Sequence, residues 1–422
     1  MSISKRYTTL LAGFIGNVIE WYDFALYGYM AGILSKLFFP NESEVASLIA
    51  TYGVFAAGFV MRPIGSFVFG WMGDTLGRSK TMMVSITMMV FPTFLLGCLP
   101  TFDAVGIWAP VLLVITRMVQ GLSVGGEFSS SVTYLVETAP PEKRGLSGSW
   151  ANTGSLFGML LGAGAAAVVT SFFSHATIMD WAWRTPFLLG GVLGAASITM
   201  RRNLPQSEHF VQHHDNREAT SPLLEVFTTN RSQTIKALIF ASAYGVLFYI
   251  PLVYLPEWLH RYAGLKLDAA LIINTAGTAV LLLLIPFSGM IGDRLMRRTK
   301  FIAAAMLGAA MVSWPLYVWL ETAGISGAII GQLILAVLIA APLGSAPAMF
   351  VELFPARDRL SGYSVAYNLG LGVVGGTTPM VCTWLIDVSG KAYSPGLYMA
   401  GMAVVAFGAL LLIKDGSREP LP

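Results

Sequence analysis

The sequence predicts an all-α membrane protein, because three of its bulk properties do not fit a soluble fold. Of its 422 residues, 55% are hydrophobic and only 12% are charged, about half the charged share of soluble domains. The mean hydropathy is +0.67. Long apolar stretches recur from end to end, each close to the roughly 20 residues that a helix needs to cross a bilayer. We therefore expect the bilayer to be the solvent of most of the chain.

Apolar spans alternate with polar segments or segments that contain Gly and Pro. Helices are the expected form, because a helix satisfies its backbone hydrogen bonds internally and the runs are too continuous for the alternating strands of a membrane barrel. We place twelve transmembrane helices at about 8–35, 47–70, 81–100, 107–136, 148–171, 183–200, 233–257, 268–291, 300–320, 325–350, 362–386 and 396–413.

Basic residues are distributed unevenly between the two sides of this topology. With the N-terminus in the cytoplasm, that side holds 19 of the 26 Lys and Arg residues and the other side holds five, while Arg62 and Arg117 lie inside spans. Cytoplasmic loops carry such an excess of basic residues. We predict a multi-pass inner-membrane protein with both termini cytoplasmic. The net charge of +3 then requires no nucleic-acid partner.

The longest polar stretch, from about Arg201 to Arg231, divides the spans six and six. It is too short for a domain with its own core. The predicted organisation is an N-terminal six-helix bundle at 1–200, a cytoplasmic linker at 201–232 and a C-terminal six-helix bundle at 233–422. We interpret His209, His213 and His214 as solvated linker residues rather than metal ligands.

Two loop signatures occur once in each half. A glycine-rich turn with an aspartate and trailing basic residues places Asp74 and Asp293 219 positions apart, and a Glu-Pro-Arg pattern places Arg144 and Arg359 215 positions apart. Such offsets indicate an internal duplication, typical of two-bundle transporters. The charges either hold loops at the headgroup layer or gate the bundles. The predicted gating residues are Arg62, Asp74, Arg78, Glu137, Arg144, Asp293, Arg297, Glu352 and Arg359.

The segment Gly70–Lys80 resembles the cytoplasmic loop motif of the major facilitator superfamily. Other segments resemble the metabolite:proton symporter family within it: Gly16, Asn17, Glu20, Trp21, Asp23 and Phe24, then Arg62–Pro63, then Gln120, Gly121, Gly125, Gly126 and Glu127, then Asp180–Arg184. The resemblance covers nearly the whole chain. It implies the major facilitator fold and a proton-coupled carrier of proline or betaine, citrate, 2-oxoglutarate or shikimate, without choosing among them.

Polar residues inside the spans form two stripes. Asn17, Glu20 and Asp23 recur every three residues on the first span, and charges at a helix centre cost roughly 2.5–3.5 kcal/mol. On the fourth span, Arg117 either recognises a substrate carboxylate as a planar fork or is permanently neutralised by an acid of the first span. The predicted proton-coupling residues are Glu20, Asp23 and Glu127, although Glu127 is equally suited to helix packing.

The second half offers polar and aromatic side chains instead of charges. Aromatic faces there could receive an ammonium group by a cation–π contact, while each ring taken singly also fits packing. The predicted substrate-binding residues of both halves are Asn17, Tyr27, Arg117, Gln120, Tyr249, Asn274, Tyr367 and Asn368.

The sequence holds no Cys/His ligand set, phosphate-binding loop or nucleophile elbow. We therefore expect no enzyme, no metal and no cofactor other than a proton gradient. The predicted function is proton-coupled symport of a small carboxylate-bearing metabolite by a monomer in the lipid bilayer. The alternatives are an exporter or facilitator of a metabolite or drug with the same fold, and a membrane sensor that binds without transporting.

Overall fold

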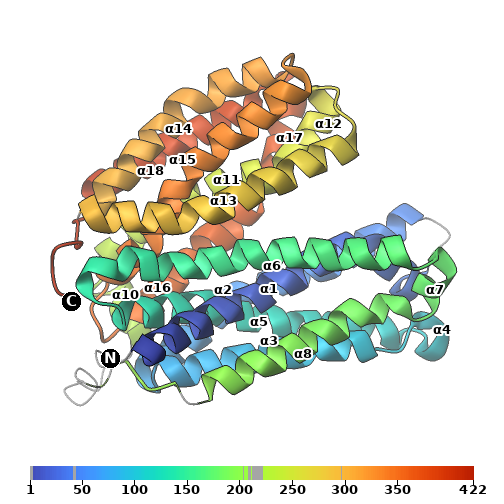
Figure 1. Cartoon of the computed structure of the whole chain (residues 1–422), viewed down its shortest axis with the longest axis horizontal. Helices are drawn as coiled ribbons and strands as arrows, with labels where there is room; N and C mark the ends of the chain where they lie inside the picture. The colour runs from blue at the N-terminus through green and yellow to red at the C-terminus, as the bar shows by residue number, and fades with distance from the viewer. Residues whose placement is uncertain (1–2, 41–43, 203, 208–210, 212–221, 296) are drawn as a thin grey trace.

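The chain forms two helical bundles in a computed structural model, shown in Figure 1. The structure describes residues 3–40, 44–202, 204–207, 211, 222–295 and 297–422. Within those ranges the regular structure is helical throughout. His209, His213 and His214 of the predicted linker lie outside the described residues.

The first bundle is the lower one in Figure 1. Its long helices are α1 (Ile3–Phe38), α2 (Glu44–Thr75), α3 (Arg78–Cys98), α5 (Trp108–Glu137), α6 (Arg144–Phe172) and α8 (Thr185–Arg201). Short pieces connect them: α4 (Phe102–Val105), η1 (Pro141–Lys143), α7 (His175–Asp180) and η2 (Ala182–Arg184).

The second bundle follows the short α10 (Pro222–Phe227). Two of its spans contain a π-helical middle: α11 (Arg231–Tyr249), η3 (Ile250–Tyr254) and α12 (Leu255–Tyr262) form one, and α16 (Arg359–Tyr367), η4 (Asn368–Gly375) and α17 (Thr378–Ser389) form the other. The remaining spans are α13 (Leu267–Leu295), α14 (Arg298–Leu320), α15 (Gly324–Leu353) and α18 (Ser394–Leu412).

Ten segments of the described chain are long and apolar enough to cross a membrane. Two more helices complete two sets of six: α1, which carries Glu20 and Asp23, and α8, which has 17 residues. The predicted fold of twelve helices in two bundles is confirmed. Arg201, the first residue of the predicted linker, is instead the buried last residue of α8.

Small residues allow the helices of the first bundle to pack with their backbones in contact. A Cβ at Gly121 of α5 would lie 1.9 Å from the carbonyl oxygen of Gly58 on α2, a distance that no side chain tolerates. Close approach of this kind is the usual basis of helix association in lipid, where apolar side chains gain little by leaving the surrounding tails.

The bundles meet through α6 against α13 and through α2 against α16. In Figure 1 they converge at the end where α10 and the start of α16 lie, and they diverge toward α7 and α12. We call the convergent end the cluster end, because two clusters of charged residues join the bundles there.

Candidate functional site

The first cluster joins α2, α3 and α5 of one bundle to the start of α16 in the other. The Asp74 carboxylate accepts hydrogen bonds from the backbone N–H groups of Leu360 and Ser361, at 3.1 and 2.8 Å. These N–H groups belong to the first turn of α16, where a helix has unsatisfied donors and a partial positive charge. The second bundle is thereby bound to the first through its own helix terminus.

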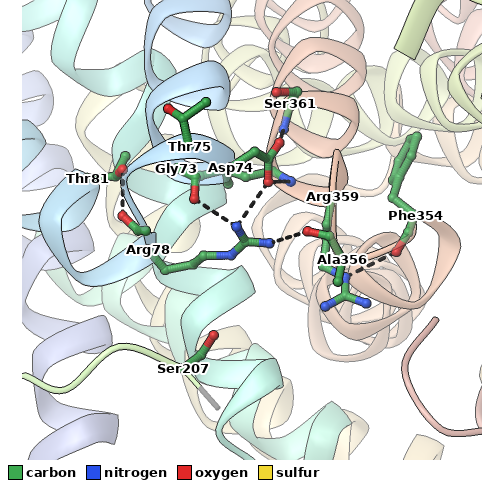
Figure 2. Close-up of polar contacts among 12 residues, drawn as sticks. Gly73, Asp74, Thr75, Arg78, Thr81, Ser207, Phe354, Ala356, Arg359 and Ser361 are labelled. Carbon is green, nitrogen blue, oxygen red and sulfur yellow. Dashed lines mark hydrogen bonds and ion pairs between the residues drawn. The ribbon is translucent and has the colours of Figure 1, made fainter. Parts of the chain in front are cut away.

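Arginines complete the first cluster, as Figure 2 shows. Arg78 lies 3.1 Å from Asp74 and donates to the carbonyl oxygen of Ala356 in the other bundle at 2.9 Å. Glu137 then lies between two arginines, 3.2 Å from Arg78 and 2.7 Å from Arg359. All four charged side chains are buried, so each charge has an opposite partner in place of water.

The second cluster repeats the first with the bundles exchanged. Asp293 of α13 accepts hydrogen bonds from the N–H groups of Gly145 and Leu146, at 2.7 and 2.8 Å, in the first turn of α6. Arg298 pairs with both Asp293 and Glu352, and Arg144 lies 3.6 Å from Glu352. The duplication seen in the loop signatures is thus a duplication of inter-bundle contacts.

Two predicted gating residues lie outside this arrangement, Arg62 of α2 and Arg297 just before α14. Arg297 is exposed, whereas its neighbour Arg298 is buried and makes the contacts that correspond to those of Arg78. The offset of 219 between Asp74 and Asp293 points to Arg297, but the second loop carries one additional residue before its buried arginine.

A polar network fills the middle of the first bundle. Arg117 pairs with Asp23 and lies 2.8 Å from Gln120, and its guanidinium stacks over the Tyr27 ring at 3.8 Å. Gln120 also donates to Asp23 and to Thr93. These predicted site residues do come together, but Arg117 is neutralised inside the bundle, which is the structural alternative to substrate recognition.

A second buried ion pair lies nearer the cluster end. Glu127 pairs with Arg201 and accepts a hydrogen bond from Ser85. Arg201 also donates to the carbonyl oxygens of Ala12 and Met82. Glu127 therefore joins α5 to α8 by an ion pair. From the sequence, Arg201 was counted among the cytoplasmic basic residues, but its side chain is buried inside the bundle.

A cavity of about 370 Å³ lies between the bundles on the side away from the clusters. Its walls come from α1, α2, α6, α11, η3, α12 and α13, and it includes the predicted Tyr249 and Asn274. Five of the sixteen lining residues are aromatic, and Arg62 is the basic group in the described lining. The aromatic residues are Trp21, Phe24, Tyr29, Phe59 and Tyr249.

Arg62 and Glu20 stand out among the charges near this cavity. Arg62 is 1% exposed and lies 5.3 Å from the Phe59 ring, and its Nε and Nη1 have no hydrogen-bond partner among the described residues. Glu20 is fully buried and interacts electrostatically with Arg62, and both its carboxyl oxygens lack a described hydrogen-bond partner. Buried polar groups without partners are uncommon in folded proteins and call for an explanation.

Two predicted substrate residues lie in a closed layer between the bundles. Tyr367 stacks on Phe128 of the other bundle, with ring centroids 4.7 Å apart and planes at 10°. Asn368 donates to the carbonyl oxygen of Gly125 at 2.9 Å. Asn17, by contrast, donates to Gly13 of its own helix. Tyr367 and Asn368 therefore belong to the contact that separates the bundle interior from the cluster end.

Sequence reasoning missed two contributors, and for Arg62, which lines the cavity, it favoured gating over substrate contact. Arg201 was assigned to a loop but pairs inside a bundle. Arg298 was passed over for Arg297. A signal was available for Arg62, because an arginine within an apolar span requires either a partner or a ligand.

The comparisons agree with this architecture. The sugar (and other) transporter family matches residues 8–242. The proline/betaine transporter of Escherichia coli strain K12 is 31% identical over 99% of this chain and 85% of its own length. The alpha-ketoglutarate permease of the same strain is 33% identical over 97% of this chain and 94% of its own length.

Among solved structures, the proton:xylose symporter XylE bound to 6-bromo-6-deoxy-D-glucose has a TM-score of 0.80. The alignment covers 99% of this chain and 98% of that one, at 17% identity. FucP in the outward conformation gives a TM-score of 0.71 at 14% identity. At these identities the structural likeness concerns the fold.

Proposed function

Because this chain belongs to the major facilitator superfamily, as a multi-pass membrane transporter of the sugar (and other) transporter family, we propose that it is a proton-coupled symporter of a small carboxylate-bearing solute. The observation that carries the proposal is the buried Arg62 guanidinium in the cavity wall, two of whose nitrogens lack a described hydrogen-bond partner, together with the buried Glu20 carboxyl that interacts with it electrostatically. The proton gradient is then the energy source, and no cofactor takes part.

Arg62 has the chemistry to bind a carboxylate. Its guanidinium presents a planar fork of donors that matches the two oxygens of a carboxylate. Two of its nitrogens are unoccupied by described residues, and the side chain forms part of the cavity wall. Arg117 also has two nitrogens without a described partner, but it is less suited because Asp23 already pairs with its charge and Gln120 accepts from its Nη1.

Glu20 makes this binding depend on a proton. When Glu20 is ionised, its negative charge neutralises Arg62 and competes with an incoming carboxylate. When Glu20 is protonated, Arg62 attracts the solute, and a neutral carboxyl is also less costly to bury without partners. Proton and anionic group therefore bind together, which is the requirement for symport.

The wall of the cavity favours a zwitterion over a di- or tricarboxylate. Arg62 offers one positive charge for one carboxylate, and the carboxylate of Glu257 in the wall is already paired with Arg261. The aromatic faces suit a weakly hydrated ammonium group through cation–π contacts. Proline- and betaine-like solutes fit this description, while a second carboxylate would meet no basic partner in the described lining.

The clusters supply the gate in this proposal. They hold the bundles together at the cluster end while the cavity lies on the other side, so the structure corresponds to one state of an alternating-access cycle. From the distribution of basic residues we propose that the cluster end faces the cytoplasm. The cavity then faces the periplasm.

Flux into proteoliposomes with an imposed pH gradient tests the function. We expect labelled betaine and proline to accumulate above their external concentration, and 2-oxoglutarate and citrate not to accumulate. Arg62→Lys keeps the charge but loses the planar fork, so solute affinity should fall at least ten-fold. Equilibration without accumulation would indicate a facilitator, and specific binding without any flux would indicate a sensor.

A further inference from the structure

The residue that begins α16 is an aspartate that does not cap its own helix. Asp358 stands at the N-cap position, and its carbonyl oxygen accepts the first helical hydrogen bond, from Gly362 at 2.8 Å. An N-cap aspartate normally accepts from the N–H groups of the second and third helical residues. In α16 these residues are Leu360 and Ser361, and Asp74 of the other bundle occupies both N–H groups.

The Asp358 carboxyl is left in an unfavourable place. It is fully buried, one oxygen accepts from Asn230 at 2.6 Å, and the other has no partner among the described residues. Burial raises the pKa of Asp358 from 3.8 to about 7. Three charged groups face Asp358: Asp74 from α2, Glu225 from α10 and Arg357 from its own loop. The nearby arginines Arg78 of α3 and Arg359 of α16 are instead paired with Glu137 of α5.

The second cluster provides a comparison within the same molecule. Lys143, 215 residues before Asp358, holds the equivalent N-cap position of α6. The backbone is nearly identical at the two positions: φ and ψ are −130° and 15° at Lys143, and −133° and 16° at Asp358. Lysine has no acceptor with which to cap a helix. A competing cap in the same chain is therefore available to α16 and unavailable to α6.

We propose that Asp358 replaces Asp74 as the cap of α16 when the cluster end opens, so that a switch between two caps lowers the free energy of the open state. Separation of the bundles leaves the N–H groups of Leu360 and Ser361 without their acceptor. A rotation of ψ at Asp358 toward the extended values usual for an N-cap brings its carboxylate to them. This inference requires alternating access but does not depend on which ion drives transport.

Opening by this route releases a proton. In the closed state the Asp358 carboxyl keeps its proton up to about pH 7, whereas two N–H donors in the open state stabilise the carboxylate. The closed state therefore binds more protons than the open state between pH 3.8 and about 7. Raising the pH at the cluster end through this window favours opening, and the effect levels off above it.

Distances between spin labels at Lys80→Cys and Lys300→Cys test the proposal. Both positions are exposed at the cluster end, one in each bundle, and Cys98 and Cys382 are first replaced by Ser. We expect the open-to-closed ratio to rise from pH 5.5 to pH 8. Asp358→Ala should lower the ratio about five-fold, as expected for loss of an N-cap, and should remove its pH dependence.

Three variants separate the cap from other roles. Asp358→Ser keeps a neutral cap, so the open state should persist without pH dependence. Lys143→Asp gives α6 the missing cap and should raise the open-to-closed ratio. Asn230→Ala removes the hydrogen bond to Asp358 but not the cap, and should also raise the ratio. If Asp358 serves only to anchor Asn230, Asp358→Ala will raise the open-to-closed ratio as Asn230→Ala does. That result would overturn the proposal. An unchanged pH response in Asp358→Ala would overturn it as well.

Discussion

Replacing Asp74 by Asn tests whether the first cluster holds the closed state. The substitution removes the charge that pairs with Arg78 and leaves one carbonyl oxygen to serve the N–H groups of Leu360 and Ser361. Hydrogen bonds to a charged acceptor contribute about 1.5–3 kcal/mol. A loss of about 2 kcal/mol corresponds to about a thirty-fold rise in the open-to-closed ratio.

The reaction of a cysteine at Ser129 with a maleimide measures this ratio. Ser129 is buried between the bundles, 3.1 Å from Ser364 of α16, so we expect it to become accessible when the cluster end opens. Asp103→Asn, an equal loss of charge at an exposed position, is the control and should leave the rate unchanged. A rate in Asp74→Asn equal to that of the parent would refute a gating role for the cluster.

Two further substitutions concern the buried ion pair of the first bundle. Glu127→Gln leaves Arg201 buried without its partner, so unfolding in detergent should become easier by about 3–5 kcal/mol, measured as a lower transition temperature or denaturant midpoint. Gly16→Ala should destabilise the same contact, because its Cβ would lie 1.9 Å from Arg201 Nη2 and 2.0 Å from Glu127 Oε1. Gly164→Ala is the control: its Cβ would enter open space, so stability should not fall.

The fold could be predicted from the sequence because lipid imposes strong rules. Long apolar runs must become helices, and a repeated loop signature places two bundles in equivalent positions. The clusters were partly predictable for the same reason. Asp74 and Asp293 were identified by their offset, although no sequence pattern shows that each accepts hydrogen bonds from a helix terminus in the opposite bundle.

The cavity residues were harder to predict because charge alone does not distinguish a paired side chain from an unpaired one. Arg117 and Arg62 both lie in apolar spans, and the sequence does not reveal that Asp23 neutralises the first. Helical spacing placed Glu20 and Asp23 on one stripe, yet Asp23 lies within the Arg117 network and Glu20 interacts electrostatically with Arg62. The difference arises from tertiary packing around α1.

The most direct test of the Arg62–Glu20 site compares two acids of α1 in proteoliposomes. For each variant, the accumulation driven by a pH gradient is divided by the rate of counterflow exchange of the same solute. This ratio cancels differences in the amount of folded transporter between preparations. Glu20→Gln imitates the protonated carboxyl, and we expect exchange to continue while gradient-driven accumulation is lost. Asp23→Asn should keep the parental ratio, since Asp23 serves to hold Arg117. The account would be contradicted if Glu20→Gln kept the parental ratio while Asp23→Asn exchanged the solute without accumulating it. Coupling would then be assigned to the Asp23–Arg117 pair.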